Sequence, residues 1–223
     1  MNGERVLPDF SLEDNLSLPS NALIAGVDEV GRGPLAGPVT AVALVFNRKK
    51  CCPKFISKIQ DSKTLSQKSR HLLFEGILNV ADFGVGWADS NEIDEKNILK
   101  ATMLAMQRSV KALETKVSRK IDFALIDGNR VPKLNSPAQH VIKGDSRSTS
   151  IAAASIIAKC TRDSFMARLA TCYPGYGWEN NAGYGTRQHL DAIDSLGITD
   201  QHRKSFKPIT DRLRAQSLVE REV

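Results

Sequence analysis

The stretch ALIAGVDEVGRGPLAGPVTAVALVF, residues 22–46, decides the fold. It begins with a short apolar run, Ala22–Val27, which ends at two acids, Asp28 and Glu29. A connection rich in glycine and proline follows, and a second apolar run occupies Val39–Phe46. Short apolar runs bounded by turn residues are typical of buried strands. The stretch therefore predicts a hairpin of two strands around a glycine-rich connection, with two carboxylates at the end of the first strand.

The rest of the chain alternates predicted strands and helices. Further strands are expected at Phe83–Ala88, Phe123–Ile126 and Gln139–Ile142. Helices are expected from the cap Ser66 to about Asn79, at Asn91–Val117, at Ser150–Ala170, at Arg187–Leu196 and from Thr210 onward. Strands interleaved with helices indicate an α/β protein with a mixed central sheet flanked by helices and a helical C-terminal part. We expect one domain over residues 21–214, between a flexible N-terminal tail (1–20) and a polar C-terminal tail (215–223).

Composition excludes some classes of protein and leaves others open. Hydrophobic residues make up 41% of the 223 residues, which is enough for a sizeable core. No apolar run approaches the roughly 18 residues that span a bilayer, and the charged N-terminus is unlike a secretory signal, so we expect a cytoplasmic protein. The net charge of +6 permits nucleic-acid binding but fits an ordinary basic protein equally well.

Acidic side chains follow two of the predicted strands. Asp28 and Glu29 come directly after the first strand, and Asp127 ends the strand Phe123–Ile126. If these strands are neighbours, three carboxylates converge, and such a cluster repels itself unless a cation fills it. Oxygen ligands favour hard ions such as Mg²⁺ or Mn²⁺, and two such ions can support phosphodiester hydrolysis. For an Asp-Glu pair alone, solvated acids at a strand end are the commoner explanation.

The block DEVGRGPLAGPV at Asp28–Val39 resembles the opening signature of the type 2 ribonucleases H, ribonuclease HII in particular. Further similar blocks follow in the order of that family. They are DSKTLS at Asp61–Ser66, IDGN at Ile126–Asn129, KGDSRSTSIAAASIIAK at Lys143–Lys159, TRD at Thr161–Asp163, YPGYGW at Tyr173–Trp178, NAGYGT at Asn181–Thr186 and HRKSF at His202–Phe206. The resemblance covers about Asn21 to Arg212, nearly the whole chain.

The resemblance implies a set of four acids that bind metal and carry catalysis. They are Asp28, Glu29, Asp127 and Asp145. Spacing alone does not favour Asp145 over Asp163, and the family pattern decides for Asp145. The implied cofactor is Mg²⁺ or Mn²⁺, with two ions during catalysis.

The resemblance also implies a set of substrate-binding residues. They are Gly31, Arg32, Gly33, Lys63, Lys143, Ser148 and Tyr184, with Ser62 and Ser146 as alternatives to Ser148. Glycine lacks a β-carbon, so its backbone can approach a ribose and its 2′-hydroxyl closely. Arg32 and the lysines suit phosphates. The family tyrosine packs on the sugar after the ribonucleotide and corresponds to Tyr184, while Ala182 stands where the family commonly has a lysine.

The implied fold is that of ribonuclease H, and the implied enzyme is a metal-dependent endoribonuclease. Its substrates are RNA/DNA hybrids and DNA containing ribonucleotides, cut in the RNA-containing strand to leave 3′-hydroxyl and 5′-phosphate ends. We expect a monomer that binds no membrane, and the C-terminus carries no sliding-clamp motif. The alternative is a catalytically silent nucleic-acid-binding protein on the same scaffold. A metal-free nuclease needs an acid–base pair, and the sequence does not pair any of the histidines His71, His140, His189 and His202.

Overall fold

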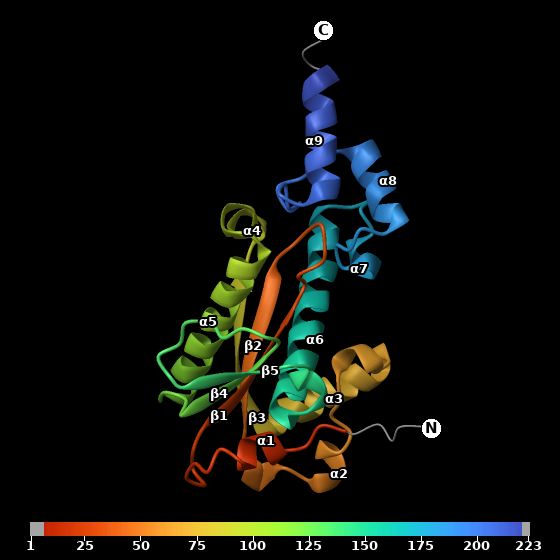
Figure 1. Cartoon of the computed structure of the whole chain (residues 1–223). Coiled ribbons are helices and arrows are strands. Elements are labelled where there is room, and N and C mark those ends of the chain that lie inside the picture. The colour runs from red at the N-terminus through yellow and green to blue at the C-terminus, as the bar shows by residue number, and fades with distance from the viewer. Residues whose placement is uncertain (1–6, 220–223) are drawn as a thin grey trace, which may run out of the picture. The chain divides into compact units, whose positions relative to one another are not determined.

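The computed structural model describes residues 7–219 (Figure 1). Its strands are β1 (Ile24–Val30), β2 (Val39–Phe46), β3 (Ala81–Ala88), β4 (Phe123–Asp127) and β5 (Ala138–Val141). Its α-helices are α1 (Ser11–Asp14), α2 (Pro53–Ile56), α3 (Gln67–Val80), α4 (Ser90–Lys96), α5 (Ile98–Val117), α6 (Thr149–Cys172), α7 (Trp178–Asn181), α8 (Arg187–Leu196) and α9 (Lys207–Val219). Short 3₁₀ turns occur at η1 (Arg48–Lys50), η2 (Ser62–Thr64) and η3 (Gly144–Ser146). No described helix is both long enough and apolar enough to cross a membrane.

The strands form a mixed five-stranded sheet in the order β3-β2-β1-β4-β5. Strands β1 and β2 pair antiparallel, which confirms the predicted hairpin. Strand β1 pairs parallel with β4, and Val27 lies opposite Ile126. The residues that follow this pair, Asp28 and Asp127, therefore emerge at the same end of two adjacent strands. The mixed sheet with helices confirms the α/β prediction.

Contacts between residues divide the chain into two compact units. Unit 1 contains the chain up to Val30, Thr40–Trp87 and Met103–Cys160. Unit 2 contains Gly31–Val39, Ala88–Thr102 and the chain from Thr161 onward. Unit 1 thus holds most of the sheet, and unit 2 holds the glycine-rich connection after β1 together with the C-terminal helices.

Helices α5 and α6 cover opposite faces of the sheet in unit 1 (Figure 1). A β-carbon on Gly26 would lie 2.2 Å from the backbone carbon of Ser150, so only glycine lets α6 come this close to β1. On the other face a β-carbon on Gly84 would lie 2.1 Å from the amide nitrogen of Leu113 in α5. The small, apolar start of α6 is thus explained by close helix–sheet packing.

One predicted helix is wrong in its extent. The periodic stretch Asn91–Val117 was expected to form a single helix, but it divides into α4 and α5 at Asn97, whose φ is +69°. The Asn97 side chain accepts a hydrogen bond from the amide of Lys100 at 3.1 Å and so starts the second helix. Asn97 therefore ends one helix and caps the next, although the periodic spacing of apolar residues continues across it.

The N-terminal segment makes specific contacts in its described part. Residue Asp9 forms an isolated parallel bridge with Ser148, and its carbonyl accepts from the amide of Thr149 at 2.9 Å. The carboxylate of Glu13, which is 3% exposed, accepts from Ser148 Oγ at 2.7 Å and from the amide of Ser150 at 3.1 Å. Residues Asp9 to Asp14 therefore hold the N-terminal end of α6, although the sequence predicted a flexible tail here.

Candidate active site

Three acids meet at the end of the paired strands β1 and β4. One carboxylate oxygen from each of Asp28, Glu29 and Asp127 lies within 4.8 Å of the others. The Asp28 side chain is buried, and its Oδ1 accepts from the amide of Glu29 at 2.7 Å. The structure therefore brings together three of the four acids predicted for the metal site, in a geometry whose ligand atoms are all oxygen.

The fourth predicted acid, Asp145, follows Gly144 on a turn held against Asp127. The amide of Gly144 donates to Asp127 Oδ1 at 2.6 Å. A β-carbon on Gly144 would lie 2.6 Å from Ile151 Cδ1 and 3.1 Å from the same Asp127 oxygen, so a larger residue would have to displace these side chains. Lys143 starts the turn with a φ of +54°. This turn fixes Asp145, which is 8% exposed, beside the acidic cluster.

Two acids of the cluster, Asp28 and Asp145, have a raised pKa. Burial raises the pKa of Asp28 well above its ordinary value, and the charges of Glu29, Asp127 and Asp145 raise it further. Burial followed by the charges of Asp127 and Asp61 raises the pKa of Asp145. Carboxylates that repel one another in a buried place are the environment that a divalent cation stabilises. The residues present therefore fit a hard metal ion.

Lys63 is the basic residue placed at this cluster. Its Nζ lies 3.7 Å from Asp145 Oδ2, and its side chain is otherwise exposed. Burial lowers the pKa of Lys63, but the charges of Asp28, Asp145, Asp61 and Asp127 together raise it. Asp61 accepts from the Lys63 amide at 2.9 Å. Sequence reasoning did not single out Asp61, although it opens the DSKTLS block.

The hydroxyl of Ser148, a predicted phosphate contact, makes hydrogen bonds inside the protein. Its side chain is fully buried, its hydroxyl donates to Glu13, and the same oxygen accepts from the amide of Ile151 at 3.1 Å. The hydroxyl is thus engaged inside the protein, and its contact with substrate stays a prediction. Lys143, by contrast, is exposed.

Unit 2 brings the glycine–arginine–glycine turn, Gly31–Gly33, next to Tyr184. A β-carbon on Gly33 would lie 3.5 Å from Cε1 of Tyr184, whose side chain is 43% exposed. Gly31 has a φ of +88°, a backbone conformation that disfavours other residues. Arg32 and Gly33 are exposed. Two of the elements predicted to read a sugar therefore lie side by side.

A buried histidine pair supports the backbone of Tyr184. His189 Nδ1 donates to the Tyr184 carbonyl at 2.9 Å, so its Nε2 is free to accept. Trp178 Nε1 donates to that Nε2 at 2.9 Å, and His202 Nε2 lies 3.2 Å from it. His202 Nδ1 accepts from the amide of Thr199 at 2.9 Å, which leaves its proton on Nε2. Burial lowers the pKa of both rings, that of His202 to about 4 with a further contribution from His189. Both histidines are neutral and buried, which suits support of Tyr184 better than acid–base catalysis.

Two buried arginines hold the glycine-rich connection of unit 2, and sequence reasoning missed both. Arg203 and Arg162 are each 0% exposed. Arg203 donates to the carbonyls of Gly31, Arg32 and Gly37 at 2.6 to 3.0 Å. Arg162 donates to the carbonyls of Pro38 at 2.9 Å, Ala182 at 2.9 Å and Ala36 at 3.2 Å. Their only sequence signal was their place in the TRD and HRKSF blocks.

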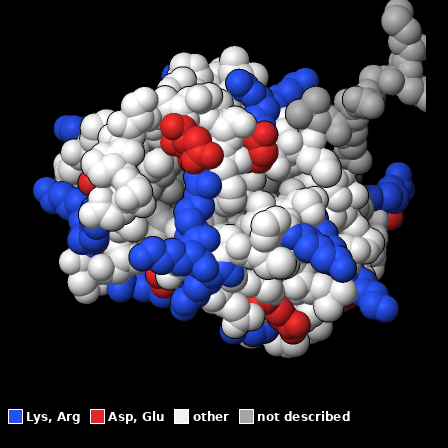
Figure 2. Space-filling view, turned by 90° about the horizontal axis from the view of Figure 1, so that it is seen from below, with Lys and Arg blue, Asp and Glu red and all other residues white. Residues whose placement is uncertain are grey.

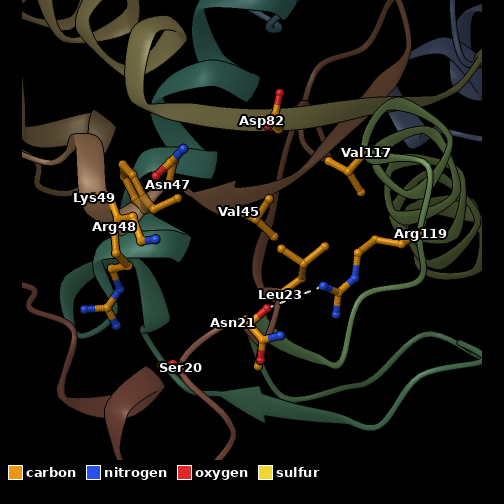
Figure 3. A pocket seen from close by; sticks show the side chains of 12 residues that line it. Ser20, Asn21, Leu23, Val45, Asn47, Arg48, Lys49, Asp82, Val117 and Arg119 are labelled. Atoms are coloured by element: carbon orange, nitrogen blue, oxygen red, sulfur yellow. Dashed lines mark hydrogen bonds between the residues drawn. The ribbon is translucent and has the colours of Figure 1, made fainter.

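The surface also carries a pocket that is separate from the acids. It has a volume of about 400 Å³ and lies in unit 1 near the start of β1 (Figure 3). Asp28 lies near the other end of that strand. Its two arginines are already paired, Arg48 with Asp14 and Arg119 with Asp122, each at 2.7 Å. Figure 2 shows Lys and Arg side chains spread over one face of the molecule, with groups of Asp and Glu between them. The pocket's own charges are largely compensated, so it does not belong to the candidate site.

Comparisons with known proteins agree with the fold described above. Residues 25–209 match the family Ribonuclease HII. A ribonuclease HII from Wolbachia sp. subsp. Brugia malayi is 49% identical over 202 residues, which cover 91% of this chain and 94% of that protein. The crystal structure of the ribonuclease H2 from Pyrococcus horikoshii OT3 superposes with a TM-score of 0.69 at 24% identity, over 84% of this chain and 95% of that one. The crystal structure of Bst-RNase HIII in complex with Mn²⁺ superposes with a TM-score of 0.67 at 20% identity, over 87% of this chain and 70% of that one.

The protein is an endoribonuclease with the ribonuclease H-like fold, as these comparisons and the acids at the ends of its strands indicate. The chain belongs to the ribonuclease HII family.

Proposed function

We propose that this protein is an endonuclease that hydrolyses the RNA-containing strand of RNA/DNA hybrids, including single ribonucleotides embedded in duplex DNA. The products would carry 3′-hydroxyl and 5′-phosphate ends. The observation that carries the proposal is the convergence of Asp28, Glu29 and Asp127, whose oxygens lie within 4.8 Å of one another. Hydrolysis with metal-activated water requires such a cluster of hard ligands.

The acids are proposed to hold two divalent ions, Mg²⁺ or Mn²⁺. Asp28, Glu29 and Asp127 offer the convergent oxygens, and Asp145 adds a fourth carboxylate on its fixed turn. When bound, such ions would activate an attacking water and stabilise the charge on the leaving oxygen. Lys63, exposed and next to Asp145, can neutralise a phosphate that approaches the cluster.

The sugar would be read by unit 2. Backbone groups of Gly31–Gly33 can approach a 2′-hydroxyl, because no β-carbon protrudes from Gly33 toward Tyr184. The Tyr184 ring offers a flat, half-exposed face for a neighbouring sugar that lacks the hydroxyl. Arg32 of unit 2 and, separately, Lys143 of unit 1 are exposed and would contact phosphates. The Gly31–Gly33 turn and Tyr184 would recognise a junction between ribonucleotide and DNA.

A duplex with one embedded ribonucleotide provides the test for metal dependence. Cleavage should require Mg²⁺ or Mn²⁺, stop in excess chelator, and be lost in Asp127→Asn while the protein stays folded. Asp145→Asn should lose activity as well. The matched control is Asp163→Asn, which the spacing of the sequence did not exclude and which should remain active. Full activity in chelator would contradict the metal mechanism, and metal-dependent binding without cleavage would favour a silent binding protein.

Replacing the tyrosine tests how the junction is read. Tyr184→Ala should slow cleavage at a single ribonucleotide by roughly ten- to hundredfold, the size of a lost hydrogen bond and lost packing. Binding to plain DNA should change much less. Equal losses on single ribonucleotides and on long hybrids would make Tyr184 a general packing residue.

We also propose that the protein is a cytoplasmic monomer. Light scattering of the purified protein would test its oligomeric state.

A further inference from the structure

We propose that Arg203 is a positioning residue that turns the amide N–H groups of the Gly31–Gly33 turn toward the substrate's sugar. The inference rests on the proposed reading of the ribose by that turn, and it adds the residue that orients it. Arg203 touches no substrate in this proposal. It acts through the backbone of a segment that precedes it by about 170 residues, since its partner Gly31 lies 172 positions earlier.

Arg203 binds the carbonyl side of two consecutive peptide units. Its Nη2 donates to the Gly31 carbonyl at 2.6 Å, and its Nη1 donates to the Arg32 carbonyl at 2.9 Å. The peptide bonds of the described chain are all trans. In a planar trans peptide the N–H of the next residue points opposite to the carbonyl. The amides of Arg32 and Gly33 therefore point away from Arg203.

The exposed side of the turn is the side to which these amides point. Arg203 is fully buried, whereas Arg32 and Gly33 are exposed and Gly33 adjoins Tyr184. Successive amides aimed in one direction form a concave donor site for an oxygen atom. A ribose 2′-oxygen or the adjoining phosphate fits this chemistry, and a deoxyribose offers no 2′-oxygen.

The bonding of Arg203 is unusual for a buried cation. The hydrogen-bond partners found for its guanidinium in the described residues are carbonyl oxygens, and no carboxylate is among them. Burial, with a smaller contribution from Arg162, lowers the pKa of Arg203 to about 9, so it stays charged at neutral pH. A planar guanidinium can serve several carbonyls at once in fixed directions, which an ammonium group cannot do. Simple packing would not need this group.

Arg162 offers a matched control. It is equally buried and packs against Gly31, but the carbonyls to which it donates belong to Ala36, Pro38 and Ala182, outside the Gly31–Gly33 turn. Replacing either arginine with lysine keeps the charge and removes the planar fork. The two variants should lose similar stability, while only Arg203→Lys removes the hydrogen bonds to the carbonyls of the turn.

The experiment compares two duplexes of the same sequence, one all DNA and one with a single ribonucleotide. Their affinities are measured by fluorescence anisotropy in Ca²⁺ to slow cleavage, and kcat and KM are measured in Mg²⁺. Arg203→Lys should reduce the preference for the ribonucleotide duplex by roughly tenfold or more, as expected for lost hydrogen bonds, with plain DNA binding changed about twofold or less. Arg162→Lys should keep most of the preference.

A second measurement does not depend on the folding of a variant. In ¹⁵N-labelled wild type, the amide signals of Arg32 and Gly33 should shift more with the ribonucleotide duplex than with DNA alone. Equal loss of preference in both variants, an unchanged preference in Arg203→Lys, or unshifted amides would overturn the proposal. If wild type itself shows no preference for the ribonucleotide, the proposed function fails, which is a different outcome.

Discussion

Replacing Asp28 with asparagine is expected to stabilise the protein in chelator while it abolishes cleavage. Asp28 is buried among acids whose oxygens lie within 4.8 Å, and burial together with their charges raises its pKa. A raised carboxyl pKa means that folding disfavours the ionised form and so costs stability. This loss of stability is complete above the pKa of the folded state and disappears below the pKa of the unfolded state. Asparagine removes this charge at every pH and can still accept from the Glu29 amide.

The magnitude follows from the spacing. Two unit charges separated by 4.8 Å repel by about 3 kcal/mol at an effective dielectric constant near 20. Asp28 has two such neighbours, but solvent and the Glu29 amide offset part of the repulsion. We expect a net gain of about 1–3 kcal/mol, which corresponds to a rise in Tm of roughly 2–10 °C for a chain of this size.

The assay is thermal unfolding at pH 8, with chelator and then with Mn²⁺. Wild type should gain stability with Mn²⁺, because an ion that binds only the folded state stabilises it, and Asp28→Asn should lose most of that gain. Asp194→Asn is the control. The hydrogen bond from Arg212 lowers the pKa of Asp194, so folding favours its charged form, and removing that charge should not stabilise the protein. An Asp28→Asn protein less stable than wild type in chelator would refute the reasoning.

Three other changes test separate parts of the structure. Gly31→Ala should lower the free energy of unfolding by at least about 1–2 kcal/mol in urea titrations, because φ is +88° and the new β-carbon would lie 2.2 Å from Arg162 Nε; unchanged stability would mean that the turn adapts. Lys63→Ala should weaken binding to all duplexes and flatten the salt dependence of affinity by about one unit, and an unchanged slope would remove Lys63 from the interface. The pKa of His202 falls from 6.5 to about 4 on folding, so stability should be complete above pH 6.5 and decrease by up to about 3 kcal/mol as the pH falls to about 4. His202→Gln should reduce this pH dependence, and His140→Gln, at an exposed site, should not.

Local signals in the sequence predicted most of the elements. The apolar run Val39–Phe46 forms β2 with the predicted bounds, and Ser66 and Thr186 cap α3 and α8 as expected. These features depend on a few neighbouring residues, whose turn and capping preferences act locally. Asn97 shows the limit of this approach, because one capping residue divided a stretch whose apolar period continued.

Sequence reasoning gave the acids more readily than their surroundings. Asp28 and Asp127 each follow an apolar run, so their meeting required only that two strands be neighbours. The burial of Arg203 could not be predicted, since arginine is rarely buried and its carbonyl partners lie far away in the chain. The hydrogen bond of Ser148 to Glu13 was equally out of reach, because Glu13 lies 135 residues earlier.

The long sequence separation between the Gly31–Gly33 turn and Arg203, which holds it, has a consequence for synthesis on the ribosome. Gly31 leaves the ribosome long before Arg203, and at roughly 5–20 residues per second the 172 intervening positions take about 10–30 s. A nascent chain can therefore acquire Asp28, Glu29, Asp127 and Asp145 before the turn that we propose to read the sugar has its final support. Such an unfinished chain would have the acids but lack the proposed preference for a ribonucleotide over plain DNA. That preference would appear only when the C-terminal segment that contains Arg203 is complete.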